Sequence, residues 1–375
     1  MKATLVLIGA GNIGTHAAPL LARIPGVGAL TVVDQDVFTA ANARGQAIEP
    51  GDVGKPKALV IAERLRRQAP GLVVCGFHAP LEHLPLGTFR ADLIVTGLDS
   101  RRARQQVNEI AFRVGGVPVI DGGVRADGLL ARVSVYDPRD PNAACLECGW
   151  SRADYARLEQ ILPCQVGTGS GATPPTNAPA ALGGLVAALQ ALEAEKWLGR
   201  RADRLPAGSE VMIDAAAHTY QRTTNRRRPS CRFDHACWRV TPVAASPATL
   251  TVADALVLGA RGSDGTPRDG DTLAVAGQAF LAALVCAACG TARPAGKLVV
   301  ALQPSDLCCA VCGHQNAPRG FDLEARLALA TLSSRALRRP LATFGIRSGD
   351  VVTVTRAGRA RHFELGARRA ARRQR

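Results

Sequence analysis

Three glycines near the amino terminus have the spacing of a phosphate-binding loop. Gly9, Gly11 and Gly14 follow the apolar run Ala3 to Ile8 in the stretch ATLVLIGAGNIGTHAAPLLARI. The first two allow a tight turn and close approach of a ligand, and the third lets a helix pack near the strand. Asp34, after a second apolar run, stands where a carboxylate would bind a ribose. The pattern fits NAD and ATP equally, so an NAD(P)-dependent oxidoreductase and an ATP-using enzyme both remain open.

The stretch VVDQDVFTAANARGQAIEPGDVGKPKA, residues 32 to 58, carries more polar residues than a dehydrogenase needs. Asp34 is followed by Asp36, Asn42 and Arg44, and Lys57 stands in the tetrapeptide GKPK. A point-charge contact with phosphate is one reason for lysine at a helix start. For GKPK alone, a solvated helix entry is the alternative interpretation.

Two further stretches complete a series of motifs. TGLDS places Asp99 after an apolar run, and RRARQQVNEIAFRVGGVPVIDGG follows it with Arg104, Asn108 and Asp121. From about Thr4 to about His235 the order and spacing of these motifs resemble the ubiquitin-activating-like adenylyltransferases, the family that includes ThiF and MoeB.

The resemblance implies an ATP-dependent adenylyltransferase. Such an enzyme attaches AMP to the C-terminal carboxylate of a small ubiquitin-like or sulfur-carrier protein, or of a peptide. By analogy, Gly9, Gly11 and Gly14 would lie against the nucleotide, and Asp34 would bind the ribose. The phosphates would be contacted by Asn42 and by the catalytic residues Arg44 and Lys57, while Asp99 would bind Mg²⁺. The resemblance also implies a homodimer.

Two departures from the family pattern are visible. The family places a short helix with Y-x-R-Q before its first strand, whereas we expect this chain to start at that strand. Its N-x-x-R-Q motif is also one residue shorter between Asn42 and Arg44. A non-catalytic member that serves as a scaffold is therefore an alternative to the enzyme.

Eleven cysteines without an export signal point to metal ligands rather than disulfides. The resemblance implies that Cys145 and Cys148 form half of a structural zinc site. Cys231 and His235 would supply the other half, with Cys237 as an alternative fourth ligand.

A second set of cysteines has the spacing of a zinc ribbon, independently of the resemblance. It consists of Cys286, Cys289, Cys309 and Cys312, and Cys308 could replace Cys309. Cys164 is either a catalytic nucleophile in a crossover loop or an incidental thiol, and Cys75 is interpreted as a small core residue.

The elements that must position these residues alternate between apolar strands and helices up to about Val135. This predicts an α/β fold with a doubly wound, mostly parallel Rossmann-like sheet and a zinc knuckle. Helices are expected over 57–68 and 180–198. We expect residues 1–238 to form the nucleotide-binding domain, and 239–375 a small zinc-ribbon and β-rich domain with a basic tail.

The composition of the chain limits which partners it is expected to bind and where in the cell it is expected to be. The net charge is +15, but no basic patch is interleaved with aromatic residues, so nucleic acid is an unlikely partner. No apolar stretch approaches the roughly twenty residues that span a bilayer, and the amino terminus shows no signal peptide. We therefore expect a cytoplasmic protein that does not bind membranes.

Overall fold

The computed structural model describes residues 2–159, 178–258, 260 and 265–367. The chain divides into two compact units, and each is described by itself. The first unit contains most of the residues up to Cys237, and the second runs from Trp238 onward and includes Pro85–Thr88. Cys164 lies outside the described residues.

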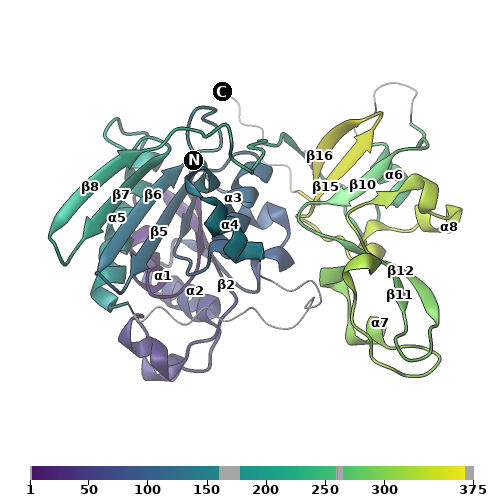
Figure 1. The fold of residues 1–375 in the computed structure, drawn as a ribbon, viewed down its shortest axis with the longest axis horizontal. Coiled ribbons are helices and arrows are strands. Elements are labelled where there is room, and N and C mark those ends of the chain that lie inside the picture. The colour runs from purple at the N-terminus through teal and green to yellow at the C-terminus, as the bar shows by residue number, and fades with distance from the viewer. Residues whose placement is uncertain (1, 160–177, 259, 261–264, 368–375) are drawn as a thin grey trace. The chain divides into compact units, whose positions relative to one another are not determined.

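The first unit is built on an eight-stranded sheet with the order β3-β2-β1-β4-β5-β6-β7-β8 (Figure 1). The first five strands in this order are parallel, and β6, β7 and β8 are antiparallel to their neighbours. The strands are β1 (Ala3–Ile8), β2 (Val27–Asp34), β3 (Val73–His78), β4 (Leu93–Thr96), β5 (Val119–Arg125), β6 (Leu130–Tyr136), β7 (Ser209–Asp214) and β8 (Thr219–Thr224). The predicted α/β class with a large, mostly parallel sheet is confirmed.

Burial along the strands follows their place in the sheet. The central strand β4 is buried at every residue, as expected of a parallel strand covered on both faces. The edge strand β8 is exposed at every residue. The interpretation of Cys75 as a core residue is wrong, because it points away from the face of β3 on which Gly76 packs against Ala58, and it is exposed.

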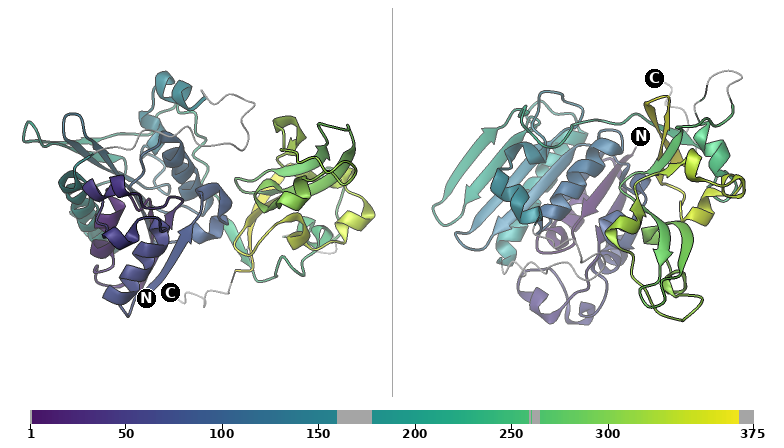
Figure 2. Two further views of the ribbon diagram at one scale, coloured as in Figure 1. Left: turned by 90° about the horizontal axis from the view of Figure 1, so that it is seen from below. Right: turned by 45° about the vertical axis from the view of Figure 1, so that its right-hand side comes forward.

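Helices cover both faces of this sheet (Figures 1 and 2). α1 (Gly14–Leu21), α2 (Lys57–Gln68) and α5 (Ala180–Leu198) share one apolar core with the strands, and α3 (Arg101–Arg113) lies on the opposite face. The helices predicted over 57–68 and 180–198 are therefore confirmed. Among the described residues, no helix combines the length and the apolar character needed to cross a bilayer.

The second unit contains two antiparallel-rich sheets and short helices. One sheet has the order β14-β10-β15-β16-β9, and the other has the order β12-β11-β13. The strands are β9 (Val240–Val243), β10 (Thr272–Val275), β11 (Phe280–Val285), β12 (Ala292–Leu298), β13 (Leu323–Glu324), β14 (Leu327–Ala328), β15 (Val351–Arg356) and β16 (Arg359–Leu365). The helices are α6 (Val252–Leu256), α7 (Pro304–Leu307) and α8 (Ser334–Leu337). This unit has an apolar core of its own.

A hairpin and a buried carboxylate organise the end of this unit. β15 and β16 are joined by Ala357 and Gly358, which both have positive φ, as a two-residue hairpin turn requires. Asp350 precedes β15, and its Oδ2 accepts the backbone N–H of Arg347 at 2.6 Å. Burial raises the pKa of Asp350 to about 6, and the nearby Arg347 opposes the shift.

Replacing Asp350 with asparagine should change how stability depends on pH. Because the folded pKa lies above the unfolded value, the carboxylate destabilises the fold once it ionises, so stability falls as pH rises from about 4 to about 6. The advantage of Asp350→Asn over the wild type should grow by about 3 kcal/mol between pH 4 and pH 7. Thermal unfolding at both pH values measures this difference, and a difference independent of pH would contradict it.

Candidate nucleotide site and cysteine clusters

The glycine loop joins β1 to α1 through close backbone contacts that exclude side chains. Gly9 has φ of +92°, and a Cβ on it would lie 2.6 Å from the carbonyl oxygen of Gly97, just after β4. A Cβ on Gly14 would lie 1.9 Å from the carbonyl oxygen of Gly9. Glycine is thus required at both positions, and the start of α1 is held against the ends of β1 and β4.

The place of this loop in the sheet is where ligands bind in doubly wound folds. β1 lies between β2 and β4, so the strand order changes direction at the β1–β4 pair. Ligands occupy the crevice outside the carboxyl ends of the strands at such a switch point. The start of α1 lies at this point, and the amino-terminal end of a helix favours a bound anion.

Asp34, the last residue of β2, fastens the glycine loop. Its Oδ2 accepts the backbone N–H of Ala10 at 2.6 Å, and its Oδ1 accepts that of Asp36 at 2.7 Å. Burial raises the pKa of Asp34, and these two hydrogen bonds oppose the shift. Asp34 therefore lies directly beside the loop.

Lys57 is the first residue of α2 and is buried. Its Nζ lies 3.2 Å from Oδ2 of Asp36, and its backbone N–H donates to the carbonyl of Asp36. The Asp36 side chain is about half exposed. This ion pair fixes an ammonium group beside the end of β2, near the loop that Asp34 fastens.

Asn42 and Arg44, the two remaining residues expected to contact phosphates, lie on a short 3₁₀ helix, η1 (Ala40–Arg44). Oδ1 of Asn42 accepts the backbone N–H of Thr39 at 2.9 Å, and Arg44 is exposed. Gly45, directly before Gln46, stands where the family pattern has its arginine. A Cβ on Gly45 would lie 2.8 Å from the carbonyl oxygen of Ala178, so this chain has no room for a side chain there.

Asp99 is exposed and follows β4, between Gly97 and the first residue of α3. The glycine loop, Asp34, Lys57 and Asp99 thus come from the carboxyl ends of β1, β2 and β4 and from the start of α2. These segments are far apart in sequence, and the parallel sheet brings their ends to one edge.

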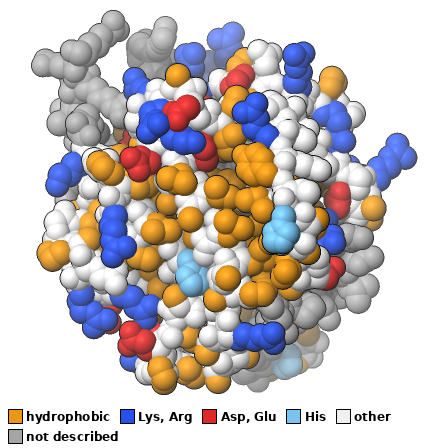
Figure 3. All heavy atoms as spheres, turned by 90° about the vertical axis from the view of Figure 1, so that its left-hand side faces the viewer, with side chains coloured by type: hydrophobic (Ala, Val, Ile, Leu, Met, Phe, Trp, Pro, Cys, Tyr) orange, Lys and Arg blue, Asp and Glu red, His pale blue; other side chains and the backbone are white. Residues whose placement is uncertain are grey.

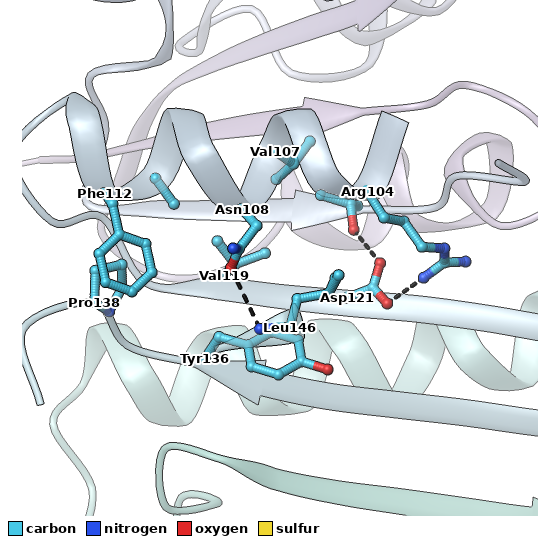
Figure 4. A pocket seen from close by; sticks show the side chains of 11 residues that line it. Arg104, Val107, Asn108, Phe112, Val119, Asp121, Tyr136, Pro138 and Leu146 are labelled. Carbon is cyan, nitrogen blue, oxygen red and sulfur yellow. Dashed lines mark hydrogen bonds and ion pairs between the residues drawn. The ribbon is translucent and has the colours of Figure 1, made fainter. Parts of the chain in front are cut away.

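A buried ionic network, which the motifs only partly indicated, lies at the end of β5. Arg104 contacts Oδ2 of Asp121 (Figure 4), and Arg132 contacts the same oxygen at 2.7 Å. Thr96 donates to Oδ1 of Asp121 at 2.6 Å. Arg132 also pairs with Glu210 at 3.2 Å. The sequence pattern identified Arg104 and Asp121 but gave no signal for Thr96, Arg132 or Glu210.

A pocket opens beside this network between α3 and the sheet. Val107, Asn108 and Phe112 of α3 line it opposite Val119, Asp121 and Tyr136 (Figure 4). Burial raises the pKa of Tyr136 to about 12. The pocket thus has an ionic end at Asp121 and an apolar end at Phe112.

Four of the predicted metal ligands of the first unit come together. Sγ of Cys145 lies 3.7 Å from Sγ of Cys148 and 3.9 Å from Sγ of Cys231. Nε2 of His235 lies 3.3 Å from Sγ of Cys148. All four ligand atoms lie within 4.8 Å of one another, and Cys237 does not belong to this group. A Cys₃His set of this kind is typical of a tetrahedral zinc site.

Glu147, between the first two of these cysteines, ties the cluster to α3. This carboxylate is buried and accepts hydrogen bonds from Gln105 at 3.0 Å, Asn108 at 3.2 Å and Tyr155 at 3.1 Å. Phe112 of the same helix packs edge-on against Phe233, between the third and fourth ligands. The cluster therefore fixes the position of α3, which begins next to Asp99.

The second cluster is formed by two similar turns in the second unit. Sγ of Cys286 lies 3.6 Å from that of Cys312, and Sγ of Cys289 lies 3.6 Å from that of Cys309. Each turn ends in a glycine of positive φ, Gly290 or Gly313, whose N–H donates to the first cysteine of the turn. Sγ of Cys308 instead donates to the carbonyl of Gly313. The four ligand atoms lie within 4.8 Å of one another, a Cys₄ set.

Together, the glycine loop, the switch point and the convergent charged residues define a nucleotide-binding α/β protein. A model of the ThiF family matches residues 1–233, and the chain belongs to this family.

Curated relatives agree with this assignment. The SAMP-activating enzyme E1 of Haloferax volcanii is 28% identical over 234 residues, which cover 62% of this chain and 80% of that protein. The sulfur carrier protein ThiS adenylyltransferase of Escherichia coli is 27% identical over 234 residues, which cover 62% of this chain and 85% of that protein. The chain is an enzyme of this adenylyltransferase type.

Among solved structures, E. coli MccB with ATP matches with a TM-score of 0.50 and 22% identity. The match covers 63% of this chain and 66% of that chain, slightly under two thirds, and it shows a shared fold.

Proposed function

We propose that this protein uses ATP to form an acyl-adenylate on the C-terminal carboxylate of a small ubiquitin-like or sulfur-carrier protein, or of a peptide. The observation that carries the proposal is the convergence of the glycine loop, Asp34, Lys57 and Asp99 at one edge of the sheet. The names of the two curated relatives, which include an E1 and a sulfur-carrier adenylyltransferase, support this substrate class. We assign residues 1–238 to the adenylyltransferase domain and 239–375 to a second domain.

In the proposed reaction a carboxylate oxygen of the carrier attacks the α-phosphorus of ATP. The bond from that phosphorus to the bridging oxygen of the β-phosphate breaks, and pyrophosphate leaves with the bonding electrons. The protein must hold the attacking oxygen in line and compensate the charge that develops on pyrophosphate.

The chain's own residues divide this work. Lys57, held by Asp36, would contact the phosphates together with Asn42 and Arg44 of η1. Asp34 would bind the ribose, and Asp99 would hold Mg²⁺, which supplies further positive charge to the phosphates. A nucleophilic role for Cys164 in a later acyl transfer stays a prediction.

Calorimetric titration with Mg·ATP, and separately with NAD, tests the nucleotide. Wild-type protein should bind Mg·ATP, and Asp99→Ala should weaken that binding. Lys57→Ala should also slow pyrophosphate exchange into ATP, measured with a carrier that ends in glycine, by at least tenfold, about 1.4 kcal/mol in the barrier. Lys55→Ala is the matched control, because Lys55 is exposed two residues away and should leave both measurements unchanged.

The opposite results would separate the alternatives. Tight NAD binding that does not respond to Asp99→Ala would identify an oxidoreductase. Binding of Mg·ATP without exchange, for any carrier, would identify a non-catalytic scaffold.

We further propose that both cysteine clusters hold structural zinc. The Cys₃His and Cys₄ sets match the ligands that zinc prefers, and small sites of this kind gain folding energy from metal. Reduced cysteines that serve as ligands also agree with a cytoplasmic location.

Metal analysis should find two zinc ions per chain, and chelation should lower the unfolding temperature. Cys148→Ser and Cys312→Ser should each lose one ion, because each removes one of four ligands. Cys237→Ser and Cys308→Ser are matched controls that should keep two. Loss of an ion in Cys308→Ser, with none lost in Cys309→Ser, would assign the fourth ligand to Cys308 instead.

A homodimer is the last part of the proposal. Apolar side chains gather on the face that carries β7, β8 and α5, with Lys and Arg around them (Figure 3). Leu192 of α5 and Tyr220 of β8 are 55% and 62% exposed. Exposed apolar patches of this kind mark interaction surfaces, and here we assign the surface to a second copy of the chain.

Light scattering should give twice the chain mass for the wild type. Leu192→Glu should give the mass of one chain, because it places a charge in the apolar surface, while Glu195→Gln on the same helix should leave the dimer intact. A wild-type mass of 39.2 kDa would contradict the dimer.

A further inference from the structure

Asn12, inside the glycine loop, joins three segments of the first unit through one amide group. Its Nδ2 donates to the carbonyl of Gly45 at 2.6 Å and to that of Ala178 at 3.0 Å. Gly45 ends η1, and Ala178 lies just before α5. The glycine loop, the residues after β2 and the start of α5 therefore meet at this side chain.

Two glycines leave the space that Asn12 occupies. A Cβ on Gly45 would lie 2.9 Å from Nδ2 of Asn12, and a Cβ on Gly183 would lie 2.0 Å from its Oδ1. Because both partners are carbonyl oxygens, which only accept hydrogen bonds, the nitrogen end of the amide must face them. The amide is thus fixed in orientation by its partners and in place by its surroundings.

The contact at Gly45 bears directly on the proposed phosphate ligands. The backbone N–H of Gly45 donates to the carbonyl of Asn42, and Arg44 is its chain neighbour. Ala47, two residues after Gly45, is held to α1 by a different side chain, because its backbone N–H donates to Oγ1 of Thr15. Asn12 is the side chain that links the carbonyl end of η1 to the glycine loop.

We propose that Asn12 is a positioning residue of the nucleotide site. It sets where η1 lies relative to the glycine loop, so that Asn42 and Arg44 can reach the phosphates of a nucleotide bound on that loop. This inference rests on the proposed function, because it assumes that η1 contacts those phosphates.

Gln190 of α5 provides a matched control. Its Nε2 donates to two carbonyls, those of Thr96 at 2.8 Å and Ile120 at 3.1 Å, and it is fully buried. Like Asn12, it has a side-chain oxygen that is buried without a hydrogen-bond partner among the described residues. It joins two strands, whereas Asn12 joins loops that carry candidate ligands. Losing either amide removes at least two hydrogen bonds, but only the loss of the Asn12 amide should displace η1.

The test is the dissociation constant of Mg·ATP, measured by calorimetry alongside the unfolding temperature. Asn12→Ala should weaken binding at least fivefold, whereas Gln190→Ala should lower the unfolding temperature and leave binding within twofold. Asn12→Leu keeps much of the volume without a donor, and it should behave like Asn12→Ala. These substitutions add no charge near the phosphates, so changed electrostatics cannot account for the loss.

A double-mutant cycle with Arg44→Ala tests whether Asn12 influences nucleotide binding through η1. If Asn12 acts through η1, Asn12→Ala should weaken binding less in the Arg44→Ala background than in the wild type. Unchanged affinity in both Asn12 variants, equal weakening by Asn12→Ala and Gln190→Ala, or strict additivity with Arg44→Ala would overturn the inference alone. A wild-type protein that binds no Mg·ATP would overturn the proposed function first.

Discussion

The close approach of backbone to backbone at the glycine loop is the constraint on which the site depends. The carbonyl of Gly9 occupies the space that a side chain on Gly14 would need, and the carbonyl of Gly97 does the same at Gly9. α1 can therefore begin directly above the ends of β1 and β4. The amino-terminal end of this helix then lies at the switch point, a position that favours a bound anion.

Two of the charged residues at this switch point, Asp34 and Lys57, are held in place by hydrogen bonds or an ion pair. Lys57 is paired with Asp36, and Asp34 accepts one hydrogen bond from the glycine loop at Ala10 and another from the backbone of Asp36. Prior fixation of this kind removes part of the ordering cost when a charged substrate binds. The exposed residues Arg44 and Asp99 are the ones that a bound nucleotide and its metal would order.

Helix α3 connects the nucleotide edge to the first cysteine cluster. Its first residue follows Asp99 by two positions, and its later turns hold Glu147 and pack on Phe233. A metal bound at Cys145, Cys148, Cys231 and His235 would thereby hold α3 as well as the two segments that carry these ligands. The second cluster joins two turns beside the small apolar core of its own unit.

The sequence by itself determined the features that local chemistry fixes. Glycine spacing, apolar runs, the helices at 57–68 and 180–198, and the paired C-x-x-C turns each depend on residues that are close in the chain. Only the tertiary structure decided which distant side chains meet. Arg132 and Glu210 join Asp121 because β5, β6 and β7 pair in one register, and Asn12 meets Ala178 across 166 residues. Such contacts depend on the relative placement of whole elements, and no local pattern encodes that placement. The exposure of Cys75 has the same origin, because an apolar run cannot tell whether its strand will lie at the centre or at the edge of a sheet.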